Sequence, residues 1–136
     1  VGSEMCIRDR AGSNTIALSF TSSPQTLELT ADISLLEKVL INLIKNSFQA
    51  LGEFGDGKVR VNAFKNIENR VIISVLDNGC GIPSTIIEDI FIPFYTTKNN
   101  GSGIGLSLSR QIMRLHSGTI TVNSIPNTET VFSLIF

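Results

Sequence analysis

The chain has 136 residues, of which 42% are hydrophobic and 17% charged, as expected for one globular domain long enough to bury a core. Its formal net charge is −1, from 11 basic and 12 acidic residues, so charge gives no argument for binding nucleic acid or an anionic membrane. No apolar run reaches the length of a membrane span, and two cysteines are too few for a disulfide framework, which favours a reducing, cytoplasmic setting.

The first segment, residues 1–13, shows neither helical nor strand periodicity. We interpret it as a leader, a linker or an artefact, expect it to be disordered, and assign the domain to residues 14–136. At the start of that domain, apolar and small polar residues alternate over residues 14–20, which predicts a half-buried strand. After a Ser-Ser-Pro turn, Leu27 and Leu29 predict a second short strand.

The strongest helical pattern covers residues 33–51. Asp32 is suited to cap its N-terminus, and Gly52 ends it. The apolar stripe of this helix is expected to contain Ile33, Leu36, Leu40, Leu43, Ser47 and Leu51. Asn42 and Asn46 are four residues apart, so they lie on a common helix face beside that stripe.

The rest of the chain predicts one hairpin, two helices and two final strands. The expected elements are strands at 59–63 and 71–76 in an antiparallel hairpin, helices at 84–90 and 106–115, and strands at 119–122 and 130–136. Leu108, Ile112 and Leu115 are expected on one face of the last helix. Interspersed helices and strands indicate an α/β (α+β) fold. We predict a two-layer sandwich with a mixed, mostly antiparallel sheet of about five strands and three main helices on one face.

A glycine-rich loop, Gly101-Ser102-Gly103-Ile104-Gly105-Leu106, directly precedes the last helix. Three glycines at alternate positions let a backbone approach a ligand closely, and the helix behind them presents free N–H groups and the positive end of its dipole. This arrangement suits an anion, most often a phosphate. A glycine-rich hinge has the same pattern, so the loop alone does not define a site.

Two further features carry candidate polar ligands. Asp77 ends a predicted strand before two glycines, so its carboxylate is placed to accept a hydrogen bond from an exocyclic amine such as that of adenine. An Asx-type turn is the alternative interpretation of this residue. Asn42 and Asn46 are suited to orient a hard cation that takes most of its oxygens from phosphate and water, or else they are exposed helix polar residues.

The segment 91–98 has no period and is expected to form a loop. Its apolar residues are suited to anchor a mobile cover over a ligand and its polar residues to approach phosphates, although a hydrophobic plug under a loop is the alternative. The apolar set is Phe91, Pro93, Phe94 and Tyr95, and the polar set is Thr96, Thr97 and Lys98.

Two patterns are set aside. Residues 52–58 match the GxxxxGK pattern of a P-loop, but Val59 follows where Ser or Thr must hold Mg²⁺, and the match comes after a helix instead of a strand. We interpret it as a turn. The single histidine, His116, lies in the last turn of a helix, where a capping role with a favourable dipole interaction is preferred to catalysis.

Four segments in this order resemble the catalytic, ATP-binding domain of bacterial sensor histidine kinases, in the superfamily that includes gyrase, the heat-shock chaperone ATPases and the mismatch-repair ATPases. They are Leu35–Ala50 (similar to the N box), Asp77–Pro83 (G1 box), Phe91–Lys98 (F box) and Gly101–Leu106 (G2 box). The PFYTTK form looks most like the nitrogen-regulation type of sensor kinase. The resemblance covers residues 15–136 and implies the Bergerat ATP-binding fold.

The resemblance implies that the chain binds Mg-ATP, with roles carried over position by position. Asn46 would bind Mg²⁺, while Asn42, Lys45 and Lys98 would lie near the phosphates and serve catalysis. The implied base-binding set is Asp77, Gly79, Gly81, Ile82 and Thr130, in which Asp77 accepts from the adenine amino group and Thr130 supports Asp77 through water. A short lid from Phe91 to Ser102 would bring Phe94, Tyr95, Thr96 and Thr97 to the nucleotide. The phosphates would be cradled by Gly101, Ser102, Gly103, Ile104, Gly105 and Leu106.

One position discriminates within the superfamily. Gyrase-like ATPases and anti-sigma serine kinases carry Glu where this chain has Asn42. A carboxylate there can act as a general base, whereas an amide cannot, so Asn42 favours transfer to an imidazole over hydrolysis. The protein then contributes alignment and charge neutralisation. An anti-sigma-type serine/threonine kinase and a non-catalytic nucleotide-binding regulatory module are the alternatives.

The chain also departs from the family pattern. Ser47 stands where Ala is usual, and no upstream helical hairpin with a phosphoacceptor His precedes the domain. We therefore expect ATP binding without self-phosphorylation. The expected partners are the phosphoacceptor and dimerisation helical domain of the same parent protein and, through it, a response regulator. Nucleic acid and direct membrane contact are not expected. The fragment is expected to be a cytoplasmic monomer, and its parent a homodimer that is either cytoplasmic or anchored in the inner membrane.

Overall fold

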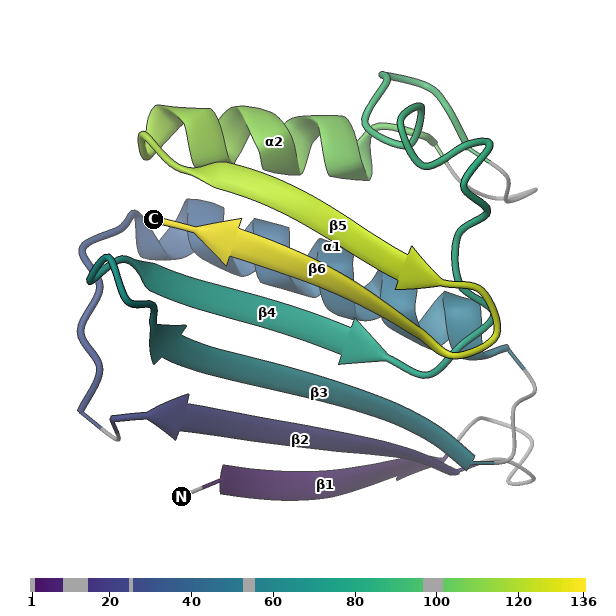
Figure 1. The fold of residues 1–136 in the computed structure, drawn as a ribbon, viewed down its shortest axis with the longest axis horizontal. Helices are drawn as coiled ribbons and strands as arrows, with labels where there is room; N and C mark the ends of the chain where they lie inside the picture. Colours follow the sequence, from purple (N-terminus) through teal and green to yellow (C-terminus); the bar gives the residue numbers. More distant parts are fainter. Residues whose placement is uncertain (1, 9–14, 25, 53–55, 97–101) are drawn as a thin grey trace.

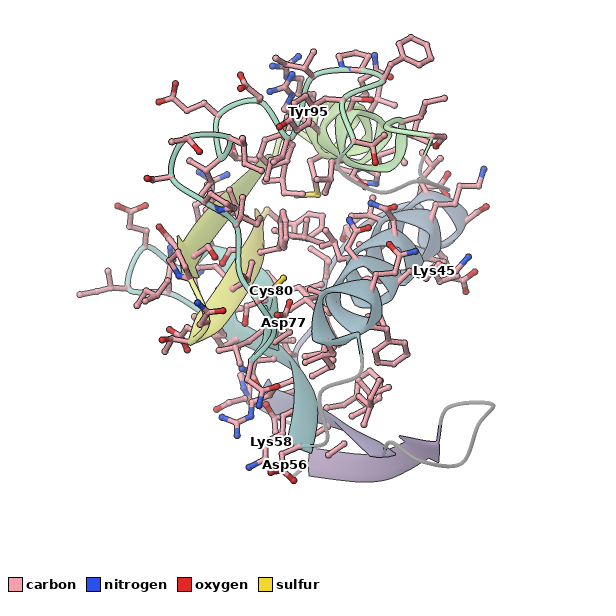
Figure 2. All side chains as sticks on the ribbon, turned by 90° about the vertical axis from the view of Figure 1, so that its right-hand side faces the viewer. Lys45, Asp56, Lys58, Asp77, Cys80 and Tyr95 are labelled. Atoms are coloured by element: carbon pink, nitrogen blue, oxygen red, sulfur yellow. The ribbon has the colours of Figure 1, made fainter. Side chains whose placement is uncertain are left out.

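The computed structural model describes residues 2–8, 15–24, 26–52, 56–96 and 102–136. Within these residues, six strands form one sheet and two α-helices cover it (Figure 1). The elements are β1 (Gly2–Arg8), β2 (Thr15–Ser23), α1 (Ile33–Leu51), β3 (Asp56–Lys65), β4 (Val71–Asp77), α2 (Gly105–Leu115), β5 (Thr119–Ile125) and β6 (Glu129–Ile135). Both helices lie on the same side of the sheet, as the side view of Figure 2 shows, so the predicted two-layer sandwich is confirmed.

The strand order is β1-β2-β3-β4-β6-β5. Only β2 and β3 pair in parallel among the described strands, and the other four pairings are antiparallel. A parallel pair needs a crossover connection, and α1, which lies between β2 and β3 in the chain, provides it. The sheet is therefore mixed and mostly antiparallel, and its hairpin from β3 to β4 was predicted. The core between the layers includes Leu43, Val75 and Leu134, each fully buried.

The first strand differs from the expectation for residues 1–13. Gly2–Arg8 forms an edge strand that pairs antiparallel with β2, from Gly2 opposite Thr21 to Arg8 opposite Thr15. This strand is the sixth, where about five were predicted. The pairing joins residues that are up to 19 positions apart in the chain, and the periodicity of residues 1–13 alone does not reveal such a partner.

Helix α1 begins and ends as predicted. The Leu35 N–H donates to Asp32 Oδ1 at 3.0 Å, so Asp32 caps the helix. The buried residues are Val39, Leu43, Ser47 and Leu51. Ile33, predicted as the first residue of the apolar stripe, is instead 74% exposed. At 100° per residue it lies about 120° around the helix from Val39, away from the sheet.

Helix α2 buries Ile112 as predicted, but the rest of its buried face differs from the prediction. Its buried residues are Ser109, Ile112 and Met113, whereas Leu108 is 43% and Leu115 76% exposed. The Ser109 hydroxyl donates to the Gly105 carbonyl oxygen at 2.8 Å, so this small polar residue is satisfied within the helix and packs inward. A prediction from hydrophobicity alone therefore did not identify the full buried face of α2.

Two expected elements are absent from the described residues. Residues 84–90 form successive turns instead of a third helix, with Ile86 N–H donating to the Pro83 carbonyl and Asp89 N–H to the Ile86 carbonyl. Residues 27–30 form no strand. Leu29 is partly buried against the core from an irregular segment, so its apolar character reflects packing and not strand pairing.

Candidate functional site

A cavity of about 790 Å³ lies between α1, the loop after β4, the loop before α2 and the end of β6. This volume is in the usual range for small-molecule and cofactor sites. Most of the predicted site residues line it, namely Asn42, Lys45, Asn46, Asp77, Gly81, Ile82, Tyr95, Thr96, Ser102, Gly103, Gly105, Leu106 and Thr130. Figure 2 shows Asp77 and Cys80 on the sheet side of the molecule, Lys45 on α1 and Tyr95 in the loop above them.

Asp77 is the buried carboxylate of the cavity. It is 2% exposed at the end of β4, and the Gly79 N–H donates to its Oδ1 at 3.0 Å. This bond forms the Asx-type turn that the sequence offered as the alternative to a binding role. Both interpretations apply, because the carboxylate also lines the cavity. Burial raises the pKa of Asp77 above its ordinary value of 3.8, against the opposing effects of the Gly79 bond and the nearby Ser47 hydroxyl.

Ser47 is the one buried side-chain hydroxyl without a hydrogen-bond partner among the described residues. It lies on the sheet-facing side of α1 and is 1% exposed. Its hydroxyl acts on Asp77 as a nearby dipole and lowers the pKa of that carboxyl, although the two groups lack direct hydrogen-bond geometry. An Ala at this position, as is usual in the resembled family, would remove that dipole.

Asn42 connects α1 to the start of α2. Its Nδ2 donates to Ser109 Oγ at 3.4 Å, and Ser109 Oγ donates in turn to the Gly105 carbonyl oxygen. A Cβ placed on Gly105 would lie only 2.1 Å from Asn42 Oδ1. The Asn42 amide therefore packs directly on the Gly105 Cα, and a larger residue at position 105 would require this amide to move. The structure brings together two motifs that are more than sixty residues apart.

The base of the loop between β4 and α2 is closed by Phe94 and Gly103. The Phe94 N–H donates to the Gly103 carbonyl oxygen at 2.8 Å. Both residues have left-handed backbones, with φ of 69° and 71°, and a Cβ on Gly103 would lie 2.3 Å from the Phe94 carbonyl carbon. The predicted residues Thr97, Lys98 and Gly101 fall between them and lie outside the described residues.

Among the predicted site residues that the structure describes, three do not line the cavity. Phe94 is 75% exposed and Ile104 42% exposed, so both side chains point to solvent. Gly79 is buried behind the cavity, where it holds the Asp77 carboxylate. We predicted these three positions because each belongs to a motif. The structure shows that some residues of a motif face the cavity and others do not.

Other lining residues were missed by sequence reasoning. They are Gln49, Ala50, Cys80, Pro83, Ile86, Ile90, Pro126, Asn127 and Phe132. Gln49 lies one helical turn from Asn46, and this spacing was an available signal. Ser124 supports the cavity wall and was also missed. It occupies an inward position after Ile120 and Val122 in β5, and the Ile82 N–H donates to its Oγ at 2.8 Å.

The donor set of the cavity fits a nucleotide with a hard cation. Asn46 offers an amide oxygen, a ligand type that Mg²⁺ accepts alongside phosphate oxygens and water. The described residues contain no group of three or more His, Cys, Asp or Glu side chains that is able to hold a metal ion by itself.

Also within this part of the chain, no helix has the length and apolar character needed to cross a membrane.

Comparison with known proteins places this geometry in one family. Residues 31–136 match the family model described as histidine kinase-, DNA gyrase B-, and HSP90-like ATPase. The chain is 41% identical over 107 residues to the signal transduction histidine-protein kinase AtoS of Escherichia coli K12, covering 79% of this chain and 17% of AtoS. It is 39% identical over 124 residues to the sensor histidine kinase ZraS of Salmonella typhimurium LT2, covering 91% of this chain and 26% of ZraS.

A solved structure agrees with these matches. The nucleotide-free catalytic domain of histidine kinase ThkA superposes with a TM-score of 0.74 at 33% identity, covering 86% of this chain and 76% of that domain. The chain thus spans about a sixth to a quarter of the length of these curated relatives, but most of the solved catalytic domain. The narrower resemblance to the nitrogen-regulation type stays a prediction.

Proposed function

Because this chain belongs to the histidine kinase-, DNA gyrase B-, and HSP90-like ATPase family, we propose that it binds Mg-ATP in the cavity and presents the γ-phosphate to a histidine. That histidine would lie on a separate helical phosphoacceptor domain of a homodimeric parent, which passes the phosphoryl group to a response regulator in cytoplasmic two-component signalling. The observation that supports this proposal most is that Asp77, Asn46 and Gly105, from three separate motifs, line one cavity.

Asp77 provides the recognition of the base. A buried carboxylate is costly unless donors satisfy both of its oxygens; the Gly79 N–H donates to Oδ1, and the 6-amino group of adenine is a further donor of the right kind. Gly81 and Ile82 line the cavity next to it, and Thr130 pairs with Asp77 across β4 and β6. The base would lie between this edge and the apolar side chains of the cavity.

The phosphates would lie at the opposite end, next to the N-terminus of α2. Gly105 begins that helix, and its first N–H groups and dipole favour negative charge. Lys45 on α1 and Lys98 in the lid would add positive charge, and Asn46 would hold Mg²⁺. When bound, Mg²⁺ neutralises phosphate charge. The chain's own residues align the nucleotide and exclude water.

Asn42 determines which reaction the site supports. Its amide is bonded to Ser109 and packed on Gly105, so it is placed to position phosphate and is chemically unable to remove a proton from water or a hydroxyl group. An imidazole acceptor needs no such base. This supports phosphotransfer to histidine over hydrolysis or a serine/threonine kinase activity.

The first test is isothermal titration calorimetry with Mg-ADP. The wild type is expected to bind, and Asp77→Asn is expected to weaken binding about 10- to 100-fold, because a hydrogen bond to a charged group is lost. Asp56→Asn makes the same charge change at an exposed position of β3, outside the cavity, and should bind like the wild type. Absence of binding by the wild type contradicts the proposal.

The second test is phosphotransfer. The protein is mixed with radiolabelled ATP and a separately produced helical domain that carries a phosphoacceptor histidine, and acid-labile phosphohistidine is measured. Its formation supports the proposal. Binding of Mg-ADP without transfer would favour the non-catalytic regulatory module, and acid-stable phosphoserine or phosphothreonine would favour the anti-sigma-type kinase.

A further inference from the structure

Ser124 belongs to a row of three polar side chains that crosses the sheet at the base of the cavity. Thr130 of β6 pairs with Asp77 of β4 on one side and with Ser124 of β5 on the other. Directly paired residues of neighbouring strands point to the same face of a sheet, and Asp77 and Thr130 both line the cavity. Ser124 therefore lies one strand behind the two residues that face the ligand.

The hydrogen bonds of Ser124 are asymmetric. Its Oγ accepts the Ile82 N–H at 2.8 Å, lies 2.8 Å from Thr130 Oγ1, and lies 3.4 Å from the Glu129 carbonyl oxygen. The single Ser124 proton has its closer acceptor in Thr130, because 3.4 Å is near the limit of a hydrogen bond. Either hydroxyl of this pair is able to donate; with Ser124 as the donor to the closer of its two acceptors, the Thr130 proton is left to point elsewhere.

In that arrangement the Thr130 proton is available to the cavity, which Thr130 lines. Thr130 is 3% exposed and lines the cavity beside Asp77, whose ionised carboxylate only accepts hydrogen bonds. An acceptor next to a donor matches the edge of adenine, where the 6-amino group donates and N1 accepts. Guanine and hypoxanthine present the reverse order, an accepting O6 next to a donating N1–H.

We propose that Ser124 is a positioning residue that fixes the direction of the Thr130 hydroxyl proton and thereby favours adenine over 6-oxopurine bases. Ser124 also holds the loop that forms the wall of the cavity, since it binds the Ile82 N–H and lies 3.0 Å from where a Cβ of Gly81 would be. This inference rests on the proposed nucleotide-binding function and adds a specificity determinant to it.

The test compares the dissociation constants of ADP and inosine 5′-diphosphate, whose base is hypoxanthine, for the wild type and Ser124→Ala. In the wild type, the fixed Thr130 proton opposes the N1–H of hypoxanthine. In Ser124→Ala the Thr130 hydroxyl is free to rotate and accept that N–H. The preference for ADP over inosine diphosphate is therefore expected to shrink about three- to tenfold, the effect of one hydrogen bond.

Two control variants separate this role from a general loss of structure. Ser124→Thr keeps the hydroxyl and should retain the wild-type preference. Thr121→Ala removes a hydroxyl from the opposite face of the same strand and should also retain it. The preference is a ratio measured within each variant, so a lower folded fraction does not change it.

A second measurement uses only the wild type. The analogue 1-deazaadenosine 5′-diphosphate keeps the 6-amino group and lacks the N1 acceptor, so it should bind about three- to tenfold more weakly than ADP. Equal affinity for the two overturns the proposal, as does an equal weakening of ADP and inosine diphosphate in Ser124→Ala. Both results leave the nucleotide function intact, whereas a wild type that binds no nucleotide overturns that function itself.

Discussion

At the scale of single residues, contact between backbone and side chain explains why the glycine motif and the asparagine motif occur together. Gly105 has no Cβ because the Asn42 amide occupies that space, at 2.1 Å from where the Cβ would be. Asn42 Nδ2 also makes a long contact of 3.4 Å with Ser109 Oγ on the same helix as Gly105. The two motifs are therefore parts of one packed unit.

Gly105→Ala is expected to lower the free energy of unfolding by about 1–3 kcal/mol, the usual effect of overpacking a closed contact. The double variant Gly105→Ala/Asn42→Ala removes the opposing amide and should recover most of that loss, since Ala is also the better helix former. Urea denaturation of the two single variants and the double variant measures the coupling. Additive losses in the double variant would contradict direct contact.

At the scale of elements, His116 connects the end of α2 to the start of α1. The Asp32 N–H donates to His116 Nε2 at 3.0 Å, and His116 Nδ1 donates to the Ile112 carbonyl oxygen at 2.8 Å. The ring also makes an edge contact with Phe136, with ring centroids 6.2 Å apart. The predicted capping role is confirmed, and the structure adds a bond that joins the two helices forming the cavity.

His116→Ala is expected to lower the free energy of unfolding by about 0.5–1.5 kcal/mol, because both hydrogen bonds of the ring are lost and water replaces the ring only at the exposed Asp32 N–H. Gln111→Ala, an exposed substitution on the same helix, provides the control and should change stability by less than about 0.5 kcal/mol. Chemical denaturation near neutral pH measures both. Equal stability of the two variants would show that the link contributes nothing.

At the scale of the whole molecule, the carboxylate that we propose for recognition of the base has a cost in folding stability. Asp77 is buried at the end of a core strand, and burial raises the pKa of its carboxyl above 3.8. The folded protein therefore holds this proton more tightly than the unfolded chain does. Its contribution to stability is complete below the unfolded pKa and decreases as pH rises through the folded-state value.

Asp77→Asn is expected to stabilise the protein without nucleotide at neutral pH, because it removes the buried charge and keeps the oxygen that accepts the Gly79 N–H. The gain over the wild type should be larger at neutral pH and shrink as the pH falls, because the raised pKa lets the wild-type carboxyl take up its proton earlier than an ordinary Asp. Thermal denaturation of both proteins across this range measures the difference. A gain that does not depend on pH would contradict the assignment to Asp77 ionisation.

The sequence by itself determined the local features of this protein. Helix α1 and its cap at Asp32 depend on neighbouring residues, and so does the β3–β4 hairpin, so both were predictable. Most of the site residues predicted from the motifs, from Asn42 to Thr130, do line the cavity, because spacing on a helix and position at a strand end are visible in the sequence alone.

Only the tertiary structure decided which residues face one another. The buried face of α2 includes Ser109 because its hydroxyl is satisfied within the helix and lies against Asn42, which no hydrophobic pattern shows. The row from Asp77 through Thr130 to Ser124 depends on the pairing of β4, β6 and β5, whose order in the sheet differs from their order in the chain. Strand pairing is a long-range interaction. The sequence alone therefore does not show that Ser124 of β5 lies next to Thr130 of β6.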